Sequence, residues 1–340
     1  MLDQLGRPLR DLRISVTDRC NLRCPYCMPR EVFGPGFAFL ERRELLTFEE
    51  ITRIARALAD LGVVKIRLTG GEPLLRRELE RLVEMLSGIG GVAEIALTTN
   101  GLLLAPRAAT LRDAGLTRVT VSLDALDRET LMSMSGAPLS PARVLAGIDA
   151  AAEAGLQPVK VNMVVRRGFN EHHVLAMAER FRHSGHVLRF IEYMDVGSSN
   201  GWQPSEVVSA EEILYGIRQR WALEELPPSR EGEVASRYRY CDGAGEIGVI
   251  HSVSKPFCGG CTRARLSADG KLYTCLFATG GHDLRALVRT GAGEEQLTRR
   301  LREIWGARAD RYSAQRSASA GLEAEPGEQP PKIEMSYIGG

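Results

Sequence analysis

Apolar runs alternate with amphipathic stretches along more than half of the chain. The apolar runs are rich in β-branched residues and predict six strands, at residues 11–16, 63–68, 94–98, 118–122, 158–165 and 187–192. The stretches between them repeat apolar residues at helical spacing and predict helices, at residues 48–61, 77–86, 106–114, 141–154 and 171–181. Because strands and helices alternate regularly, we expect a parallel sheet covered by helices.

Local signals mark the ends of the predicted helices. Thr47 precedes the first helix and Glu50 follows three residues later, which is the spacing of a capping box. Gly115 ends the third helix. Periodicity does not separate a closed barrel from an open sheet, but six units instead of eight indicate an incomplete barrel. In either fold, functional residues gather at the carboxyl ends of the strands.

The pattern changes after residue 198. For this part we predict a loop at 197–202, a helix at 210–220 and strands at 236–241 and 246–252. A hairpin of 264–267 with 271–275 follows, and then helices at 282–288 and 294–305. Residues 313–331 have the composition of a mobile linker and precede an apolar tail at 332–340. We therefore expect a barrel at 1–197, a C-terminal domain at 198–312, and a linker with a docking tail at 313–340.

Composition places the chain among ordinary globular proteins. It has 340 residues, of which 44% are hydrophobic and 26% are charged, with a formal net charge of +1. This balance does not indicate a general nucleic-acid binder. We expect no membrane association and a cytoplasmic location, because no run of about 18 apolar residues occurs and the first residues lack the pattern of a signal peptide.

Six of the seven cysteines form two triplets, which favours reduced, metal-binding thiolates over disulfides. The first triplet is Cys20-x3-Cys24-x2-Cys27. Cubane iron–sulfur clusters are normally held by four cysteines, so three thiolates leave one iron free to bind a small molecule. The alternative is zinc with a remote fourth ligand, although structural zinc sites favour paired ligand motifs. We expect Cys241, the seventh cysteine, to be a small buried hydrophobic residue.

The second triplet is Cys258-x2-Cys261-x13-Cys275, again without a fourth cysteine. Taken alone, this spacing fits zinc as well as iron, with His282 or Asp283 as the fourth zinc ligand. The presence of the first triplet favours iron here too. We expect a second iron–sulfur cluster whose free iron faces a ligand such as the substrate.

Several cations occur where apolar residues dominate. Arg67 and Lys160 lie within predicted strands, where a charge is costly unless it is paired. Arg263 and Arg265 are two residues apart on a strand and therefore share a face. These cations face either an anion in the barrel lumen or internal carboxylates. The G-x4-GK[ST] motif is absent, so the sequence does not indicate a P-loop nucleotide site.

Two levels of resemblance emerge from these motifs. The first triplet, with Tyr26 inside it, and the loop Gly70-Gly71-Glu72-Pro73 resemble the radical S-adenosylmethionine (SAM) superfamily. Nearly the whole chain resembles the GTP 3′,8-cyclase family, through residues 12–24, 66–74, 189–194 and 258–265 and the terminal Gly339-Gly340. The resemblance implies an α/β fold, a partial (β/α)6 barrel of the radical SAM type open at one side, with a C-terminal extension that carries a second iron–sulfur cluster.

The resemblance also implies a ligand for each candidate residue. The implied cofactors are SAM and two [4Fe-4S] clusters, the first on Cys20, Cys24 and Cys27 and the second on Cys258, Cys261 and Cys275. The implied SAM contacts are Tyr26, Gly71, Ser122 and Met194. The implied GTP contacts are Arg13, Arg67, Thr98, Lys160, Arg263 and Arg265. Residues implied at the reacting centre are Arg189, Gly339 and Gly340.

The implied activity is the cyclisation of GTP, the first step of molybdenum cofactor biosynthesis. A 5′-deoxyadenosyl radical from SAM abstracts the 3′ hydrogen of GTP, and C3′ attacks C8 of guanine to give 3′,8-cyclo-7,8-dihydro-GTP. The implied partners are an electron donor such as a flavodoxin or ferredoxin and a downstream cyclic pyranopterin monophosphate synthase, and a homodimer is compatible with the resemblance. Two other hypotheses stay open: a radical SAM modifier of peptides or nucleotides, and an iron–sulfur protein that binds SAM without catalysis.

Overall fold

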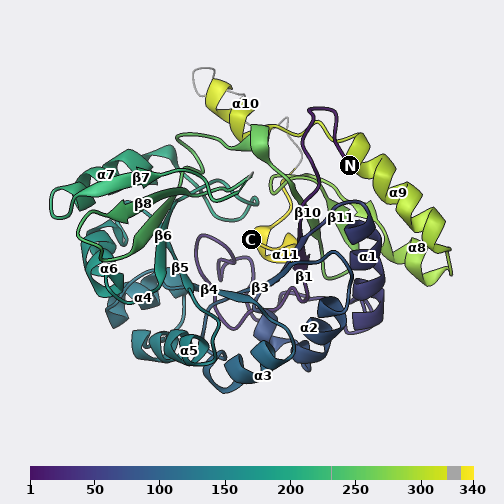
Figure 1. The fold of residues 1–340 in the computed structure, drawn as a ribbon, viewed down its shortest axis with the longest axis horizontal. Coiled ribbons are helices and arrows are strands. Elements are labelled where there is room, and N and C mark those ends of the chain that lie inside the picture. The colour runs from purple at the N-terminus through teal and green to yellow at the C-terminus, as the bar shows by residue number, and fades with distance from the viewer. Residues whose placement is uncertain (231, 320–330) are drawn as a thin grey trace.

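One sheet organises the computed structural model, which describes residues 1–230, 232–319 and 331–340. Its twelve strands follow the order β12-β11-β10-β1-β2-β3-β4-β5-β6-β9-β8-β7. The central strands β1 to β6 are parallel and consecutive in the chain. Figure 1 shows these strands curving around a central space, with the helices on the outside.

The six strands predicted for the first part of the chain are confirmed. They are β1 (Asp11–Ser15), β2 (Lys65–Thr69), β3 (Glu94–Thr99), β4 (Arg118–Ser122), β5 (Lys160–Val165) and β6 (Val187–Glu192). The helices that connect them are α1 (Phe48–Asp60), α2 (Leu79–Ser87), α3 (Ala108–Asp113), α4 (Arg128–Ser135), α5 (Pro141–Glu153) and α6 (Val174–Phe181). The predicted capping box is present at α1, where the Thr47 hydroxyl accepts from the Glu50 amide and the Glu50 carboxylate accepts from the Thr47 amide.

Side-chain alternation along the strands separates the core from the inner space. On β1, Leu12 and Ile14 are fully buried in the apolar core, while Arg13 lies on the opposite face and lines the central cavity. On β5, Val161 belongs to the core and Asn162 lines the cavity in the same way. Because successive side chains of a strand point to opposite faces, polar side chains lie on the inner face of the sheet and apolar ones on the outer face.

The rest of the chain extends this sheet at both edges. At one edge, β9 (Glu246–Ile250) pairs in parallel with β6 and is followed by β8 (Ser236–Tyr240) and β7 (Leu223–Leu226). At the other edge, β10 (Arg263–Leu266) pairs in parallel with β1 and is followed by β11 (Lys271–Tyr273) and β12 (His282–Asp283). Within the described residues the two ends of the sheet do not pair, so the incomplete barrel is confirmed. The remaining helices are α7 (Ala210–Arg218), α8 (Arg285–Arg289), α9 (Glu294–Gly306), α10 (Tyr312–Ser319) and α11 (Met335–Ile338).

Four local predictions were wrong or incomplete. The helix expected at 282–288 begins only at Arg285, because His282 and Asp283 form the short edge strand β12. The expected linker is helical up to residue 319, and its residues 320–330 lie outside the described part. Cys241 is exposed instead of buried. Helix α4 and strand β7 were missed because both are short and contain few apolar residues.

The C-terminal tail lies inside the curved sheet. Helix α11 and the chain end occupy the centre of the ribbon view, surrounded by β1, β3 and β10 (Figure 1). Ile338 is fully buried there. Over the described ranges, none of the helices combines the length and apolar character that crossing a bilayer requires.

Candidate functional site

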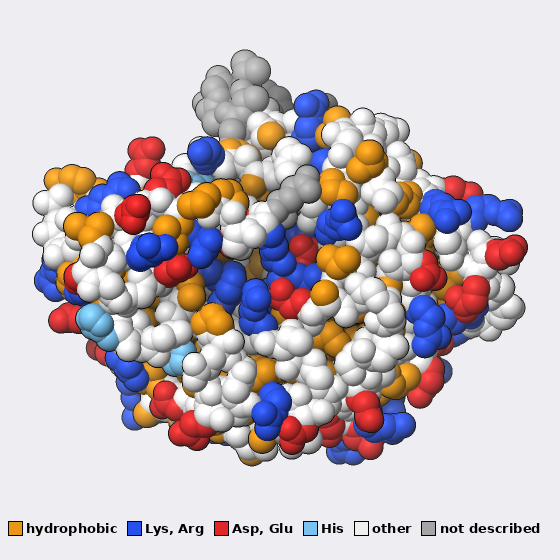
Figure 2. Space-filling view, viewed as in Figure 1, with side chains coloured by type: hydrophobic (Ala, Val, Ile, Leu, Met, Phe, Trp, Pro, Cys, Tyr) orange, Lys and Arg blue, Asp and Glu red, His pale blue; other side chains and the backbone are white. Residues whose placement is uncertain are grey.

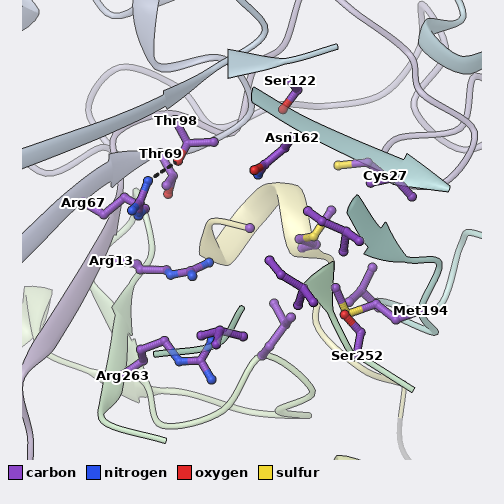
Figure 3. A pocket seen from close by; sticks show the side chains of 18 of the residues that line it. Arg13, Cys27, Arg67, Thr69, Thr98, Ser122, Asn162, Met194, Ser252 and Arg263 are labelled. Atoms are coloured by element: carbon purple, nitrogen blue, oxygen red, sulfur yellow. Dashed lines mark hydrogen bonds between the residues drawn. The ribbon is translucent and has the colours of Figure 1, made fainter. Parts of the chain in front are cut away.

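A large cavity lies on the inner face of the sheet and brings together nearly all the predicted site residues. Its lining includes Arg13, Cys20, Cys24, Tyr26, Cys27, Arg67, Gly71, Thr98, Ser122, Lys160, Arg189, Met194, Cys258, Cys261, Arg263, Arg265, Cys275 and Gly340. Gly339 is the one predicted residue outside this lining, and its carbonyl accepts a hydrogen bond from Arg265. In Figure 3 the labelled arginines lie to one side of the tail helix, and Cys27 and Met194 lie to the other.

The loop before the first cysteine triplet is seated on the carboxyl end of β2. The Gly71 amide donates to the Thr17 carbonyl at 2.8 Å, and the Glu72 amide donates to the Arg19 carbonyl at 2.8 Å. A Cβ atom at Gly71 would overlap the Arg19 carbonyl, so only glycine permits this approach. The two-glycine motif therefore has a structural role beside its predicted SAM contact: it holds the chain that leads into Cys20.

The thiols of the first triplet are free, and all three line the cavity. Burial raises the pKa of Cys20 to about 11 and the pKa of Cys27 to about 12. For Cys24, burial raises the pKa first, and the neighbouring Cys27 and Cys20 raise it further. Three such thiolates need a cationic partner, which an iron cluster supplies, so the donor set fits the predicted group.

Sequence reasoning missed Asp124 beside this triplet. Its carboxylate accepts from the Tyr26 hydroxyl at 2.8 Å and from the Val164 amide at 2.9 Å. Burial raises the pKa of Asp124 to about 6, although both hydrogen bonds oppose this shift. Asp124 thus fixes the ring of Tyr26 against the cavity. The available signal was its place two residues after β4, where polar residues of parallel sheets collect.

The second triplet comes from two places along the C-terminal extension. Cys258 begins the short 3₁₀ turn η5 (Cys258–Gly260), Cys261 ends that turn, and Cys275 follows β11. Burial raises the pKa of Cys261, but the nearby guanidinium of Arg263 outweighs it with help from Arg308, so the pKa falls to about 6. The Arg263 guanidinium lies 3.3 Å from the Cys261 sulfur. A thiol held ready to ionise is suited to metal ligation.

The zinc alternative for this triplet gains no support. His282 and Asp283 are exposed in β12 and do not line the cavity. Throughout the described ranges, no three His, Cys, Asp or Glu side chains converge closely enough to hold a single metal ion. A cubane binds one thiolate at each of several irons, so its ligands need not meet at one point.

Three arginines form a row across neighbouring strands. Arg13 on β1 is in register with Arg265 on β10 and with Arg67 on β2. The Arg67 guanidinium donates to the hydroxyls of Thr98 at 2.9 Å and Thr120 at 3.1 Å. These partners are neutral, and the carboxylates of Asp11 and Glu94 act on Arg67 only through space, without an ion pair to it in the described part of the chain. Figure 2 shows Lys and Arg side chains, in blue, gathered in the central hollow.

Several cations of the lumen depress one another's pKa, whereas for Arg263 burial is outweighed by the neighbouring Cys261 thiol, which raises the pKa. Burial, followed by the charges of Arg265 and Arg263, lowers the pKa of Arg13 well below its usual range. Burial and Arg263 lower the pKa of Arg265 to about 9, and burial with Arg189 lowers that of Lys160 to about 7. Burial comes first in each case, and neighbouring cations add repulsion that a bound anion would relieve.

Internal carboxylates, the alternative partners for these cations, act on them only at longer range, through Asp11 and Glu94. Across the described residues, the ion pairs do not involve Arg13, Arg67, Lys160, Arg263 or Arg265. Instead Lys65, which sequence reasoning overlooked, pairs with Glu94 at 2.7 Å at the start of β2. Arg189 is held by an uncharged group too, since its Nε donates to the Asn162 side chain at 2.9 Å. Asn162 was also missed, because an amide within an apolar strand carries little signal.

Comparisons with known proteins agree with this geometry. Residues 14–181 match the Radical SAM superfamily, and residues 186–314 match the family described as Molybdenum Cofactor Synthesis C. A crystal structure of Streptococcus suis SuiB bound to S-adenosylmethionine is similar with a TM-score of 0.60 and 15% identity, covering 83% of this chain and 65% of that one, which supports the fold. Fold and first triplet together define a radical SAM protein.

Full-length relatives narrow the assignment. The GTP 3′,8-cyclase of Acidothermus cellulolyticus is 56% identical over 358 residues, covering 99% of this chain and 98% of the relative. The GTP 3′,8-cyclase of Xanthomonas axonopodis pv. citri is 51% identical, covering 100% of this chain and 99% of the relative. The chain belongs to the GTP 3′,8-cyclase family.

Proposed function

We propose that this chain is a radical SAM enzyme that cyclises GTP to 3′,8-cyclo-7,8-dihydro-GTP, the first step of molybdenum cofactor biosynthesis. The observation that carries the proposal is the row of Arg265, Arg13 and Arg67, which form no ion pair among the described residues, in one cavity with both cysteine triplets. A polyanionic nucleotide bound along this row would lie between the two metal-binding ends of the cavity. Family membership supports the same substrate.

The first triplet would hold an iron–sulfur cluster and SAM at the carboxyl ends of the strands. Cys20, Cys24 and Cys27 supply the thiolates, and the remaining position is left for SAM. When bound, this cluster supplies the electron that cleaves SAM. The predicted SAM contacts support a binding surface because they all line the same cavity, namely Tyr26, Gly71, Ser122 and Met194.

The triphosphate of GTP would bind the lumen cations. The predicted contacts are Arg13, Arg67, Thr98, Lys160, Arg263 and Arg265, and each lines the cavity. Charge-assisted hydrogen bonds to phosphate contribute roughly 1.5–3 kcal/mol each, which is enough to fix the nucleotide at one end. The ribose and base would then extend toward the first triplet, as abstraction of the 3′ hydrogen requires.

The second triplet would hold a second [4Fe-4S] cluster on Cys258, Cys261 and Cys275. Three cysteines again leave one position open toward the cavity. Arg189, Gly339 and Gly340 would position the reacting ribose and base. Helix α11 lies at the centre of the curved sheet and would reduce the access of water to the radical.

The remaining assignments follow from this activity. A flavodoxin or ferredoxin would supply electrons, and a cyclic pyranopterin monophosphate synthase would consume the product. We also propose a cytoplasmic location, no nucleic-acid or membrane partner, and an organisation into a barrel at 1–197, a second-cluster domain at 198–312 and a tail at 313–340. A homodimer is compatible with this organisation.

Anaerobic turnover tests the proposal. Reconstituted protein incubated with GTP, SAM and a reductant should form 5′-deoxyadenosine and a product with the mass of GTP, and mass spectrometry with SAM-free controls detects both. We expect about eight irons per chain, the content of two cubane clusters. Cleavage of SAM with every guanine nucleotide unchanged would contradict the cyclase activity, while about four irons would contradict the second cluster.

A further inference from the structure

The N-terminal segment is tied to the second cysteine triplet by a buried group of three charged side chains. The Asp3 carboxylate receives Arg7 Nε at 2.6 Å and Arg308 Nη1 at 3.3 Å. The side chains of all three residues are at most 2% exposed. The two arginines belong to segments about 300 residues apart in the chain, so only the folded protein brings them to one carboxylate.

Each arginine also donates a hydrogen bond to the backbone carbonyl of one cysteine. Arg7 Nη1 donates to the Cys258 carbonyl at 3.0 Å, and Arg308 Nη1 donates to the Cys261 carbonyl at 2.8 Å. The loop between these two cysteines is thus held at both ends by donors that Asp3 aligns. The indole of Trp305 packs against the Arg308 guanidinium and donates to the Arg7 carbonyl at 3.3 Å, which fixes the group further.

Both arginines also turn guanidinium groups toward the cavity, and one of their donors has no partner within the described residues. Arg7 Nη2 is buried without a hydrogen bond, whereas Arg308 Nε lies 3.4 Å from the Asp310 carboxylate. Arg308 also acts on the Cys261 thiol, whose pKa it helps Arg263 to lower, and both arginine side chains line the cavity beside the triplet. A buried, unpartnered guanidinium N–H is costly, so its presence calls for an acceptor. The inorganic sulfides and thiolates of an iron–sulfur cluster are such acceptors.

We propose that Arg7 and Arg308, aligned by Asp3, are positioning residues of the second cluster: they hold the Cys258–Cys261 loop through its carbonyls and donate N–H groups toward the bound cluster. This inference rests on the second cluster of the proposed function. Positive charge and N–H donors near cluster sulfurs raise the reduction potential. The N-terminal segment therefore sets the potential of a cluster whose ligands lie some 250 residues later in the chain.

The test compares variants of the full chain after anaerobic reconstitution. Iron content and an EPR-monitored redox titration are measured for native protein, Arg7→Gln, Arg308→Gln and Asp3→Asn. Added SAM perturbs the signal of the first cluster, so the signal that does not respond belongs to the second. Arg289→Gln is the matched control, because Arg289 pairs with Glu50 on the surface, away from the cavity.

We expect the midpoint potential of the second cluster to become more negative in Arg7→Gln and Arg308→Gln, with the first cluster unchanged. Asp3→Asn removes a negative charge and should shift the midpoint in the opposite direction, which a merely structural role would not produce. Selective loss of the second cluster from either arginine variant also supports the holding role. If both arginine variants retain native iron content and native midpoints, the proposal is overturned. If native protein holds about four irons, the second cluster itself fails, and that result is separate from the arginine comparison.

Discussion

Arg265 Nη1 donates a hydrogen bond to the backbone carbonyl of Gly339, so a cation of the lumen row holds the penultimate residue of the chain. Gly339 has a φ of +80°, and its backbone passes directly beside the Thr69 hydroxyl. The tail and the proposed phosphate site therefore share a side chain. This contact links the position of the chain end to the arginines that we expect to bind GTP.

Gly339→Ala should abolish cyclisation while leaving SAM binding nearly intact. A Cβ atom at this position would overlap Thr69 Oγ1, and the positive φ adds about 1–3 kcal/mol of strain for a residue with a side chain. The tail would then leave its place in the lumen. Product formation by mass spectrometry and SAM affinity by calorimetry check the two halves of this prediction.

Gly216→Ala is a suitable control, because that glycine lies in α7 with open space around its Cα. It should retain native activity, since alanine favours a helix more than glycine does. Native turnover by Gly339→Ala would show that the tail position is irrelevant to the reaction.

Arg67→Met should weaken GTP binding roughly tenfold to a hundredfold without changing SAM affinity. The range corresponds to the loss of one charge-assisted contact to phosphate. Arg67 donates hydrogen bonds to the hydroxyls of Thr98 and Thr120 and forms no ion pair among the described residues, so its loss breaks few polar interactions of the protein. Equilibrium dialysis with each ligand measures the two affinities, and Arg237→Met, which removes a surface ion pair to Glu246, serves as the control. Equal weakening of both ligands would indicate a folding defect and contradict a specific phosphate role.

Above neutral pH, GTP binding should be accompanied by the uptake of a proton at Lys160. Burial and the charge of Arg189 lower its pKa to about 7 in the free protein, and a bound triphosphate would raise that pKa again. Affinity should therefore fall as the pH rises above about 7, where the free lysine is neutral. Calorimetry in buffers of different ionisation enthalpy measures the proton uptake, and Lys160→Met should remove it.

The lowered pKa of Lys160 also affects the free energy of unfolding. The unfolded chain keeps Lys160 protonated up to its ordinary pKa, so between about pH 7 and that value the unfolded state binds more protons than the folded state. Through this residue, the free energy of unfolding rises with pH across that window. A Lys160→Met variant whose stability shows the same pH dependence as the native chain would rule out the depressed pKa.

Much of the fold and of the site can be predicted from the sequence because local patterns encode it. The capping box of Thr47 and Glu50 and the apolar strands appear where the pattern places them. Arg67 and Lys160 reach the cavity because an isolated cation in an apolar strand must face a lumen or a partner. Asp124 could not be identified in this way, since a single carboxylate after a strand is ambiguous until Tyr26 is placed beside it.

Contacts between distant segments mark the limit of sequence reasoning. The hydrogen bond from Arg308 to Asp3 joins residues 305 positions apart, and no periodicity records such a pair. The edge strand β12 forms by pairing with β11, and the local sequence does not record this pairing. Its two residues were therefore read as the start of the following helix. Pairing and ion-pair geometry depend on the assembled sheet, whereas strand and helix patterns do not.

A group of polar and charged side chains around Asp195 fastens the start of the tail. The Lys332 ammonium lies 2.9 Å from the Asp195 carboxylate, the Tyr312 hydroxyl donates to it at 2.7 Å, and Arg316 pairs with it as well. Burial raises the pKa of Asp195, but Lys332, Tyr312 and Arg316 outweigh it and hold the pKa below its usual range. The carboxylate therefore remains charged at neutral pH and anchors the start of the tail beside Met194.

Asp195→Asn should release the tail without unfolding the barrel. Loss of the charge weakens three contacts, and even one charge-assisted bond of roughly 1.5 kcal/mol shifts the docking equilibrium about tenfold. We expect faster hydrogen exchange across residues 332–340 and slower cyclisation, with unchanged exchange in β1 to β6. Asp242→Asn is the matched control, because it removes an exposed ion pair to Arg182 far from the tail. Activity of Asp195→Asn should recover in part when a peptide of residues 332–340 is added, since the free peptide can occupy the site that the released tail leaves. Native exchange rates in the tail of Asp195→Asn would show that its docking depends on the buried Ile338 and the Arg265 contact instead.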